Sequence, residues 1–238
     1  YDKTSTPLTK SLESEAIAVH YEDRIEQIPS WITQSLPEDT LVIYTPAVPP
    51  THTELNWFQD NGFTVQKRSK VLGWITESYT TLAIAGTHGK TTTSSLVAHI
   101  LNESGHGCNA FLGGITANFN SNLLYSATSD LMVVEADEYD RSFLALSPTL
   151  AVITSMDADH LDIYGDPAAL VQTYSEFAAC TKPEGTVLLH EDLPQIEIAA
   201  NLMRYGKSPE ADYRYTETEI RDGEWKFDIY GNGLTIED

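Results

Sequence analysis

Residues 81–93 read TLAIAGTHGKTTT: an apolar run leads into a loop with two glycines, and Lys-Thr-Thr-Thr follows. An apolar run that ends in such a loop and continues into a helical pattern is typical of a phosphate-binding junction between a strand and a helix. Backbone N–H groups of the loop and the positive end of the helix attract phosphate oxygens, and a lysine neutralises their charge. The stretch therefore predicts an α/β sheet with a nucleoside triphosphate at its edge.

This loop is shorter than the general phosphate-loop pattern G-x-x-x-x-G-K-[ST], which would place glycine at Ile84. The first glycine is Gly86, so the motif is Gly-Thr-His-Gly-Lys-Thr over residues 86–91. The alternative is an ordinary glycine turn with an exposed lysine. We expect ATP to be bound by the loop and the first helical turn: Gly86, Thr87, His88, Gly89, Lys90, Thr91 and Thr92.

The amino-acid composition argues against several classes of protein. The 238 residues are 41% hydrophobic, which suffices for a packed core, and the net charge of −21 with only 14 Lys and Arg argues against a nucleic-acid surface. No apolar run reaches the length of a membrane span, and no hydrophobic signal segment follows the first residues. Two cysteines do not form a disulfide framework. We therefore expect a cytoplasmic globular protein with neither a membrane nor a nucleic-acid partner.

Two blocks are predicted along the chain. Residues 1–68 alternate short strands and helices, with strands at 16–20, 40–44 and 63–66 and a helix between 51 and 61. This pattern predicts part of a Rossmann-like domain, and because it begins in mid-pattern and without methionine, we expect the front of that domain to precede the sequence. Residues 69–238 are predicted to form a P-loop-type central domain with a mostly parallel sheet.

Three apolar runs in the second block predict neighbouring buried strands. They cover residues 81–85, 131–134 and 150–155, and the polar clusters that follow them cover 86–91, 135–141 and 156–162. In open α/β sheets ligands bind at the carboxyl ends of the strands, so three such clusters can meet at one site.

The remaining elements follow from periodicity and turn residues. A helix after Lys90 is predicted to pack one side against the sheet, and a second helix begins at Asp166 and precedes a strand at 186–189. The residues expected to face the core are Leu96, Val97, Ile100 and Leu101 in the first helix, and Leu170, Tyr174 and Phe177 in the second. Asp222-Gly223 and Asn232-Gly233 predict terminal β-hairpins.

Several polar residues are candidates for the chemistry. Glu135 ends a buried strand and, with the Thr91 hydroxyl, offers the oxygen ligands that Mg²⁺ prefers; a solvated acidic loop is the alternative. His160 lies among aspartates after the third strand and is predicted to bind a second cation or to orient substrate. The segment 111–122 is rich in glycine and asparagine, which fits either a polar substrate groove or an ordinary turn-rich loop.

Three ordered motifs resemble the central-domain motifs of the Mur ligases. They are GTHGKTTT at 86–93, EADEYDRSF at 135–143 and DADHLD at 157–162. The resemblance implies an ATP-dependent amide ligase of peptidoglycan precursor synthesis, and the histidine in the first motif points to the member that joins L-alanine to UDP-N-acetylmuramate. In that reaction the muramyl carboxylate attacks the γ-phosphate, and the amine of L-alanine then displaces phosphate from the acyl phosphate.

The resemblance also implies roles for single residues. Lys90 would neutralise the β- and γ-phosphates, Thr91 and Glu135 would hold Mg²⁺, and His160 would serve a second Mg²⁺ near the attacking carboxylate. Lys90 and His160 are thus the expected catalytic residues. Substrate contacts are expected from Asn118, Asn120, Asp137 and Arg141.

The sequence lacks two parts that the family normally has, and two other functions are alternatives to this hypothesis. The glycine-rich loop that grips the UDP moiety and the third domain of the family are not in the sequence, so we expect the chain alone to be inactive. Within the family, the alternative is the ligase that attaches a recycled tripeptide to the same sugar nucleotide. Outside it, the alternative is an ATP-binding switch or scaffold without ligation. The sequence does not determine the oligomeric state.

Overall fold

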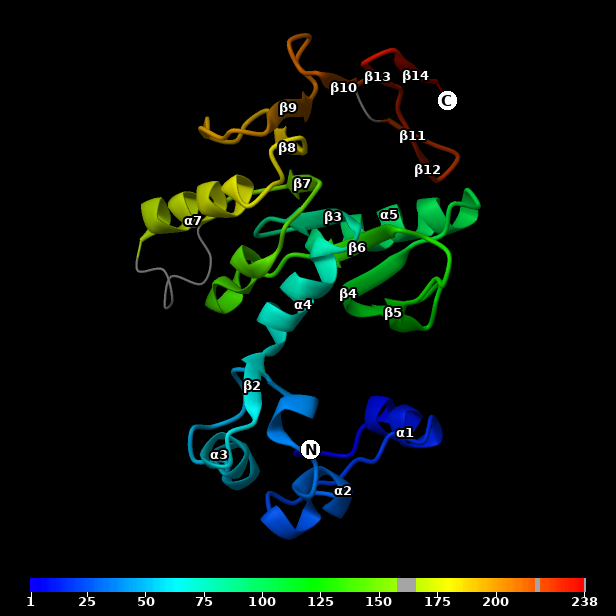
Figure 1. Cartoon of the computed structure of the whole chain (residues 1–238). Helices are drawn as coiled ribbons and strands as arrows, with labels where there is room; N and C mark the ends of the chain where they lie inside the picture. The colour runs from blue at the N-terminus through cyan, green and yellow to red at the C-terminus, as the bar shows by residue number, and fades with distance from the viewer. Residues whose placement is uncertain (158–165, 217–218, 238) are drawn as a thin grey trace. The chain divides into compact units, whose positions relative to one another are not determined.

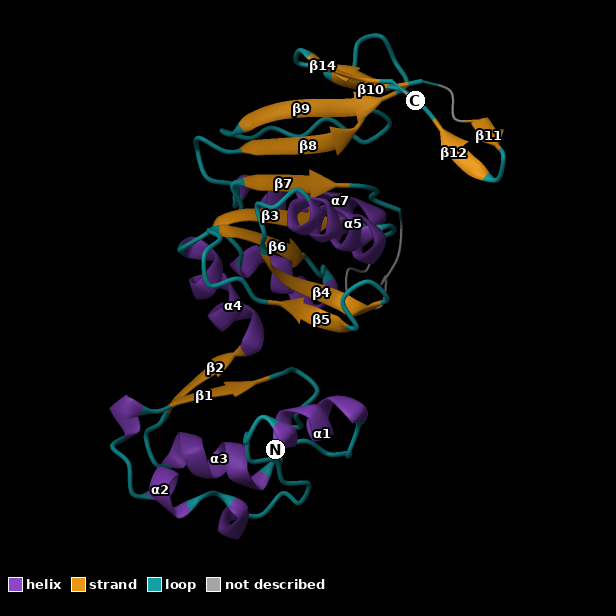
Figure 2. Ribbon diagram, turned by 90° about the vertical axis from the view of Figure 1, so that its right-hand side faces the viewer, coloured by secondary structure: helices purple, strands orange, loops and turns teal. Residues whose placement is uncertain are grey.

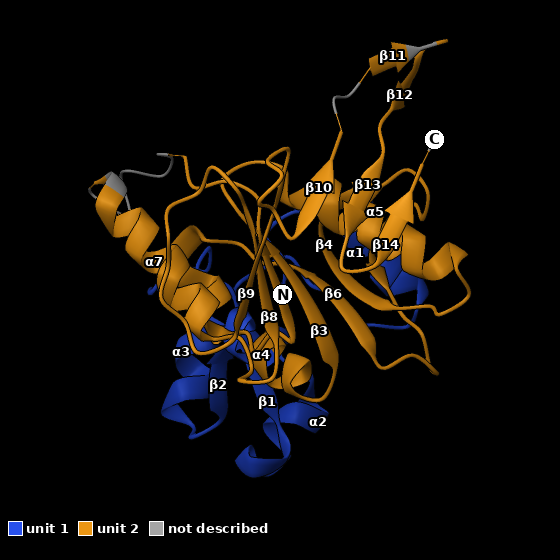
Figure 3. Ribbon diagram, turned by 90° about the horizontal axis from the view of Figure 1, so that it is seen from above, with its two compact units in different colours: residues 1–71 blue, residues 72–238 orange. Residues whose placement is uncertain are grey.

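The computed structural model describes residues 1–157, 166–216 and 219–237, and the chain divides into two compact units, Tyr1–Val71 and Leu72–Asp238 (Figure 3). The helix α4 (Arg68–Glu77) runs across this division. The other elements of the first unit are α1 (Pro7–Ser14), η1 (Ile25–Gln27), α2 (Ser30–Thr33), η2 (Pro37–Asp39), β1 (Leu41–Tyr44), α3 (Thr53–Asp60) and β2 (Thr64–Lys67).

The first unit is a small α/β arrangement. Strands β1 and β2 pair in parallel, with Leu41 opposite Thr64, and α3 is the crossover between them. The predicted strands at 40–44 and 63–66 and the helix between them are confirmed. The strand predicted at 16–20 is wrong: α1 ends just before it, Ala16 has the left-handed φ of 64°, and the residues after it pair with no strand of the described chain.

The second unit is built on a ten-stranded sheet in the described residues (Figures 1 and 2). Its strand order is β14-β13-β10-β9-β8-β7-β3-β6-β4-β5, and β11 pairs with β12 in a separate hairpin. The elements are β3 (Thr80–Ala85), α5 (Lys90–Glu103), β4 (Asn109–Thr116), β5 (Ser121–Leu124), β6 (Leu131–Glu135), η3 (Tyr139–Ala145), β7 (Leu150–Ile153), α7 (Pro167–Ala179), β8 (Thr186–His190), β9 (Asn201–Gly206), β10 (Tyr213–Tyr215), β11 (Glu219–Arg221), β12 (Glu224–Lys226), β13 (Ile229–Gly231) and β14 (Leu234–Ile236).

The sheet is mostly parallel, as predicted. Neighbouring strands from β4 through β6, β3, β7, β8 and β9 to β10 pair in parallel, whereas β5 at one end of the sheet and β13 and β14 at the other pair antiparallel. The two predicted turns, at 222–223 and 232–233, form the hairpins β11–β12 and β13–β14. The segment 111–122, for which a groove or a loop was expected, is mostly strand: it forms β4, a tight turn and the start of β5.

Both faces of the central strands are buried, which explains why they read as continuous apolar runs. Successive residues of β6 alternate between two clusters: Met132 and Val134 pack with residues of η3 and α7, and Val133 packs with Ala98 of α5. The predicted inward face of α7 is confirmed, because Leu170, Tyr174 and Phe177 are fully buried. Within the described residues, no helix is both long and apolar enough to span a membrane.

The predicted packing face of α5 is partly wrong. Leu96 and Ile100 are 55% and 62% exposed, and the helix is buried at Ser94 and Ala98 instead. Small side chains allow the helix to lie close to the sheet, and Leu96 and Ile100, two positions along from Ser94 and Ala98, face away from it. Helical periodicity alone favoured the larger side chains.

The different burial of Ile153 and Ile100 predicts that their replacement by alanine lowers the free energy of unfolding by different amounts. Ile153→Ala removes a fully buried side chain at the end of β7 and should lower the free energy of unfolding by about 2–5 kcal/mol. Ile100→Ala, the same change at a position that is 62% exposed, should stay within about 0.5 kcal/mol. Urea unfolding of both variants measures the difference, and equal losses would contradict the assignment of the core.

Candidate nucleotide site

The loop 86–89 joins β3 to α5 with two glycines in conformations that other residues rarely adopt. Gly86 has φ 132° and Gly89, the N-cap of α5, has φ 84°. A Cβ atom at Gly86 would overlap the Thr154 hydroxyl and the backbone nitrogen of Ser155. Glycine is therefore required at Gly86 both for the turn and for the close approach of the next strand.

The residues that follow β7 fix the shape of this loop. The Thr154 hydroxyl donates to the His88 carbonyl at 2.5 Å, and the His88 N–H donates to the Ser155 hydroxyl at 2.8 Å. The Thr87 hydroxyl donates to the Asp157 carbonyl at 2.9 Å. The His88 imidazole itself is exposed, with Nε2 3.8 Å from Asp157 Oδ2. The sequence predicted that β7 ends near the loop, but gave no sign that Thr154 and Ser155 would hold it.

Lys90 folds back over the loop that precedes it. Its Nζ donates to the Gly86 carbonyl at 2.8 Å and more weakly to the Thr87 carbonyl at 3.4 Å. It also donates to Glu138 Oε1 at 2.9 Å in an ion pair whose carboxylate side chain is only 2% exposed. The lysine charge is therefore held at the point where backbone N–H groups and the start of α5 favour an anion.

Glu135 lies beside the first turn of α5, as predicted. Its carboxylate accepts hydrogen bonds from the Thr91 hydroxyl at 2.9 Å, from the Gly113 N–H at 2.8 Å and from the Ser94 hydroxyl at 3.5 Å. A Cβ atom at Gly113 would overlap the carboxylate, so that glycine makes room for it. The carboxylate and the Thr91 hydroxyl are hard oxygen donors held together, which suits a Mg²⁺ ion whose other ligands are phosphate and water.

The other predicted site residues are more dispersed. Thr92 and the exposed Asn118 line a cavity of about 270 Å³ between the start of α5 and the β4–β5 hairpin, and Thr91 lines it as well. Asn120 has φ 49° and donates its N–H to the Thr116 carbonyl, which makes it a turn residue of that hairpin. His160, with the neighbouring Asp159 and Asp162, lies outside the described residues.

Asp137 and Arg141 lie in the segment after β6. Asp137 Oδ1 accepts from the Tyr139 N–H at 3.1 Å and so shapes the entry to η3. The Arg141 guanidinium is 3.9 Å from Glu176 of α7, and Asp140 and Arg141 both have positive φ, 52° and 55°. Two successive left-handed residues without glycine store backbone strain beside the site. No sequence signal indicated that strain.

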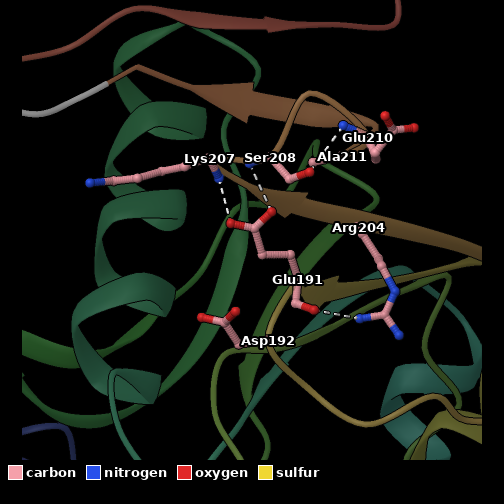
Figure 4. Close-up of a pocket in the computed structure, with 7 residues that line it drawn as sticks. All are labelled: Glu191, Asp192, Arg204, Lys207, Ser208, Glu210 and Ala211. Carbon is pink, nitrogen blue, oxygen red and sulfur yellow. Dashed lines mark hydrogen bonds between the residues drawn. The ribbon is translucent and has the colours of Figure 1, made fainter.

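A second polar cavity, of about 620 Å³, lies at the ends of β8 and β9 (Figure 4). The Glu191 carboxylate accepts from the N–H groups of Lys207 at 2.7 Å and Ser208 at 2.9 Å, and Gly206 leaves space for it. The Arg204 guanidinium donates to the carbonyls of His190, Glu191 and Leu193. These groups hold the loops after β8 and β9 to one another, so their hydrogen bonds serve the loop structure.

The hydrogen bonds from Lys207 and Ser208 hold the pKa of Glu191 below its ordinary value, because they stabilise the ionised carboxylate. A lowered pKa in the folded state contributes stability that is present above the ordinary pKa of about 4.3 and is lost as the pH falls through the folded-state pKa.

Comparison with known proteins shows which family and which relatives the chain resembles. A family model described as the Mur ligase middle domain matches residues 84–236. The UDP-N-acetylmuramate--L-alanine ligase of Cytophaga hutchinsonii is 51% identical over 234 residues, which are 96% of this chain and 50% of that relative. The chain thus spans about half the length of the curated relatives that it matches.

Two solved structures support the fold. The UDP-N-acetylmuramate-alanine ligase MurC from Thermotoga maritima is 25% identical, with a TM-score of 0.65 over 82% of this chain and 46% of that one. The UDP-N-acetylmuramate:L-alanyl-gamma-D-glutamyl-meso-diaminopimelate ligase from Neisseria has a TM-score of 0.82 over 98% of this chain and 75% of that one. Its identity is 20%, so it shows a shared fold and no more.

Gly113 provides a test of the Glu135 site. Gly113→Ala should displace the carboxylate and weaken Mg²⁺-dependent binding of ATP about 10–100-fold, because a Cβ atom would push the predicted metal ligand Glu135 out of position. Gly114→Ala is the control, since a Cβ atom there meets only the Thr91 methyl at 3.7 Å. Calorimetric titration with ATP in the presence and absence of Mg²⁺ measures the effect. Equal affinities in the two variants would contradict the role of Glu135.

Glu191 provides a test of the second cavity. Glu191→Gln should destabilise the protein at pH 7, and the difference from wild type in free energy of unfolding should shrink as the pH falls below about 4. Urea unfolding between pH 7 and pH 3.5 measures it. Glu210→Gln, at an exposed carboxyl of the same cavity, is the control. A difference that is constant with pH would show that the ionised carboxylate is not responsible.

Proposed function

The chain belongs to the Mur ligase family, and from that premise we propose that the full-length protein joins L-alanine to the carboxylate of UDP-N-acetylmuramate at the expense of ATP. The observation that carries the proposal is the contact of Thr91 with Glu135, 2.9 Å apart, beside the loop that holds Lys90. This contact brings phosphate-binding and cation-binding groups to one edge of the sheet. The relative from Cytophaga, at 51% identity, supplies the choice of acceptor.

The two parts of the chain are assigned different tasks. We assign residues 1–68 to part of the domain that binds the UDP moiety and residues 69–238 to the ATP-binding central domain. The phosphate loop, Glu135 and the end of β7 all lie in the second part, so phosphoryl transfer is assigned there. The reaction belongs to peptidoglycan precursor synthesis, and we propose that it occurs in the cytoplasm.

The loop binds the triphosphate through its backbone and Lys90. The N–H groups at the start of α5 have no side-chain cap within the described chain and are available to phosphate oxygens, and Lys90 offsets the charge of the β- and γ-phosphates. Phosphoryl transfer depends mostly on positioning and on neutralisation of charge, because little covalent chemistry is required of the protein. The hydrogen bonds that Thr154 and Ser155 make with the His88 backbone, here called the clamp, keep the loop in its binding shape before the nucleotide arrives.

Thr91 and Glu135 fit a Mg²⁺ ion that accompanies the triphosphate. Such an ion takes one or two protein oxygens and keeps phosphate and water as its other ligands, so the larger cluster of ligands that is absent from the described residues is not needed. When bound, Mg²⁺ neutralises charge that develops on the phosphates. The three hydrogen bonds to the Glu135 carboxylate hold it in place for this role.

The chemistry then requires the substrate carboxylate in line with the γ-phosphate. A carboxylate oxygen attacks the γ-phosphorus, the bond to the β–γ bridging oxygen breaks, and ADP leaves. The neutral amine of L-alanine attacks the acyl carbon and the bond to the phosphate oxygen breaks, so that inorganic phosphate leaves; the nitrogen gives up one proton to solvent and keeps the other as the amide N–H. The cavity lined by Thr92 and Asn118 adjoins Thr91, so we assign it to the side from which the sugar nucleotide approaches. We keep substrate contacts for Asn120, Asp137 and Arg141, and a second-cation role for His160, as predictions.

The two alternatives receive less support. A ligase that attaches a tripeptide shares the fold, but one solved example is 20% identical to this chain, whereas the alanine-adding relative is 51% identical. A switch that binds ATP without making a bond would need the phosphate loop and one cation, and the family to which the chain belongs consists of ligases.

The acceptor is identified by ADP release from the full-length protein. With Mg²⁺, ATP and UDP-N-acetylmuramate present, ADP release should require L-alanine and should be absent with the tripeptide or with other amino acids. Lys90→Ala should reduce the rate by at least about 100-fold, since it removes charge neutralisation at the transferred phosphate. Release that requires the tripeptide would identify the recycling ligase, and release without any acceptor would contradict the ligase proposal.

A further inference from the structure

Glu138 was not among the predicted site residues, yet among the ion pairs that the described residues make with the phosphate loop it forms the shorter one. Its Oε1 is 2.9 Å from Lys90 Nζ, and the side chains are 2% and 15% exposed. The carboxylate comes from the segment after β6, three residues beyond Glu135. A buried ion pair of this kind stabilises the site only while each charge keeps a partner, because an uncompensated buried charge is costly.

The hydrogen bonds of Lys90 show what a nucleotide must displace. An ammonium group has three protons, and in this structure they point to the Gly86 carbonyl, to Glu138 and, at 3.4 Å, to the Thr87 carbonyl. The positive charge is also already matched by the Glu138 carboxylate. A triphosphate that needs both protons and charge from Lys90 therefore competes with Glu138 for them.

We propose that nucleotide binding at this loop is an exchange of counter-ions, in which the triphosphate takes Lys90 from Glu138 and Glu138 takes it back when the nucleotide leaves. The inference rests on the proposed function only in that ATP is the nucleotide. The loop carbonyl of Gly86 keeps its hydrogen bond to Lys90 throughout, since it lies on the loop that both anions face. Only the anionic partner changes.

The exchange has opposite consequences for the free and the bound site. In the free site, Glu138 keeps Lys90 folded over the loop and stabilises its empty form. In the bound site, the negative charge of Glu138 competes with the phosphates for Lys90, so it weakens binding. The same residue speeds the departure of ADP, because it recaptures Lys90 as the diphosphate leaves.

The test is nucleotide binding by the full-length protein with Glu138→Gln. The variant should bind Mg²⁺–ATP more tightly, on the order of tenfold, because a charge-assisted hydrogen bond no longer opposes it. It should release a fluorescent ADP analogue more slowly. Its affinity for AMP, which lacks the β- and γ-phosphates, should not change. A merely structural role would not separate ATP from AMP.

Three further variants make the result specific. Glu103→Gln removes the same charge from an exposed position at the end of α5 and should leave ATP affinity unchanged. In the Lys90→Met background, Glu138→Gln should tighten ATP binding by less, because there is no lysine to compete for. If Glu138→Gln does not fold, Glu138→Asp, whose shorter side chain holds Lys90 less closely, should tighten Mg²⁺–ATP binding and slow release of the ADP analogue by a smaller factor.

The outcomes distinguish this inference from the proposed function. Weaker or unchanged ATP binding in Glu138→Gln would overturn the exchange and would show instead that Glu138 holds Lys90 in its nucleotide-contacting position. An equal gain with and without Lys90 would also overturn it, since it would reflect repulsion of the phosphates alone. Failure of the wild-type protein to require L-alanine for ADP release would count against the proposed acceptor and would leave the binding experiment interpretable.

Discussion

The parallel pairing of β6, β3 and β7 determines where every group of the nucleotide site lies. Because the three strands run in the same direction, their carboxyl ends meet at one edge, and the chain leaves each strand with a different part of the site. β3 supplies the loop with Lys90, β6 supplies Glu135 and then Glu138, and β7 supplies the residues that clamp the loop. A shift of one strand by two residues would separate these groups by more than the length of a hydrogen bond.

The sequence was sufficient to predict this part of the fold because burial leaves a simple pattern. Strands covered on both faces read as unbroken apolar runs, and the glycine and lysine of the loop stand directly after one of them. The parallel sheet, the helix at 167–179 and the terminal hairpins were predicted for related reasons. Lys90, Thr91 and Glu135 were predicted from the sequence, and in the structure Thr91 and Glu135 are hydrogen-bonded to each other while Lys90 bonds the loop carbonyl of Gly86.

Other features depend on contacts that one sequence does not reveal. The clamp from Thr154 and Ser155 depends on which hydroxyl faces the His88 backbone, and Glu138 becomes a partner of Lys90 only because the chain turns back after β6. The face of α5 was misjudged because periodicity favours large apolar residues, whereas close packing selected Ser94 and Ala98. The strand predicted at 16–20 had the right composition and no partner strand in the described chain.

An acidic protein repels a polyanionic ligand unless local groups at the binding site attract it. The chain carries a net charge of −21, and beside the loop Lys90 is paired with the Glu138 carboxylate while the Glu135 carboxylate accepts a hydrogen bond from Thr91. Side-chain charge alone therefore repels a triphosphate, and attraction must come from backbone N–H groups, from the start of α5 and from the cation that travels with the nucleotide. These sources act over a few ångströms. Attraction of the phosphates is consequently confined to ligands that place them inside the loop.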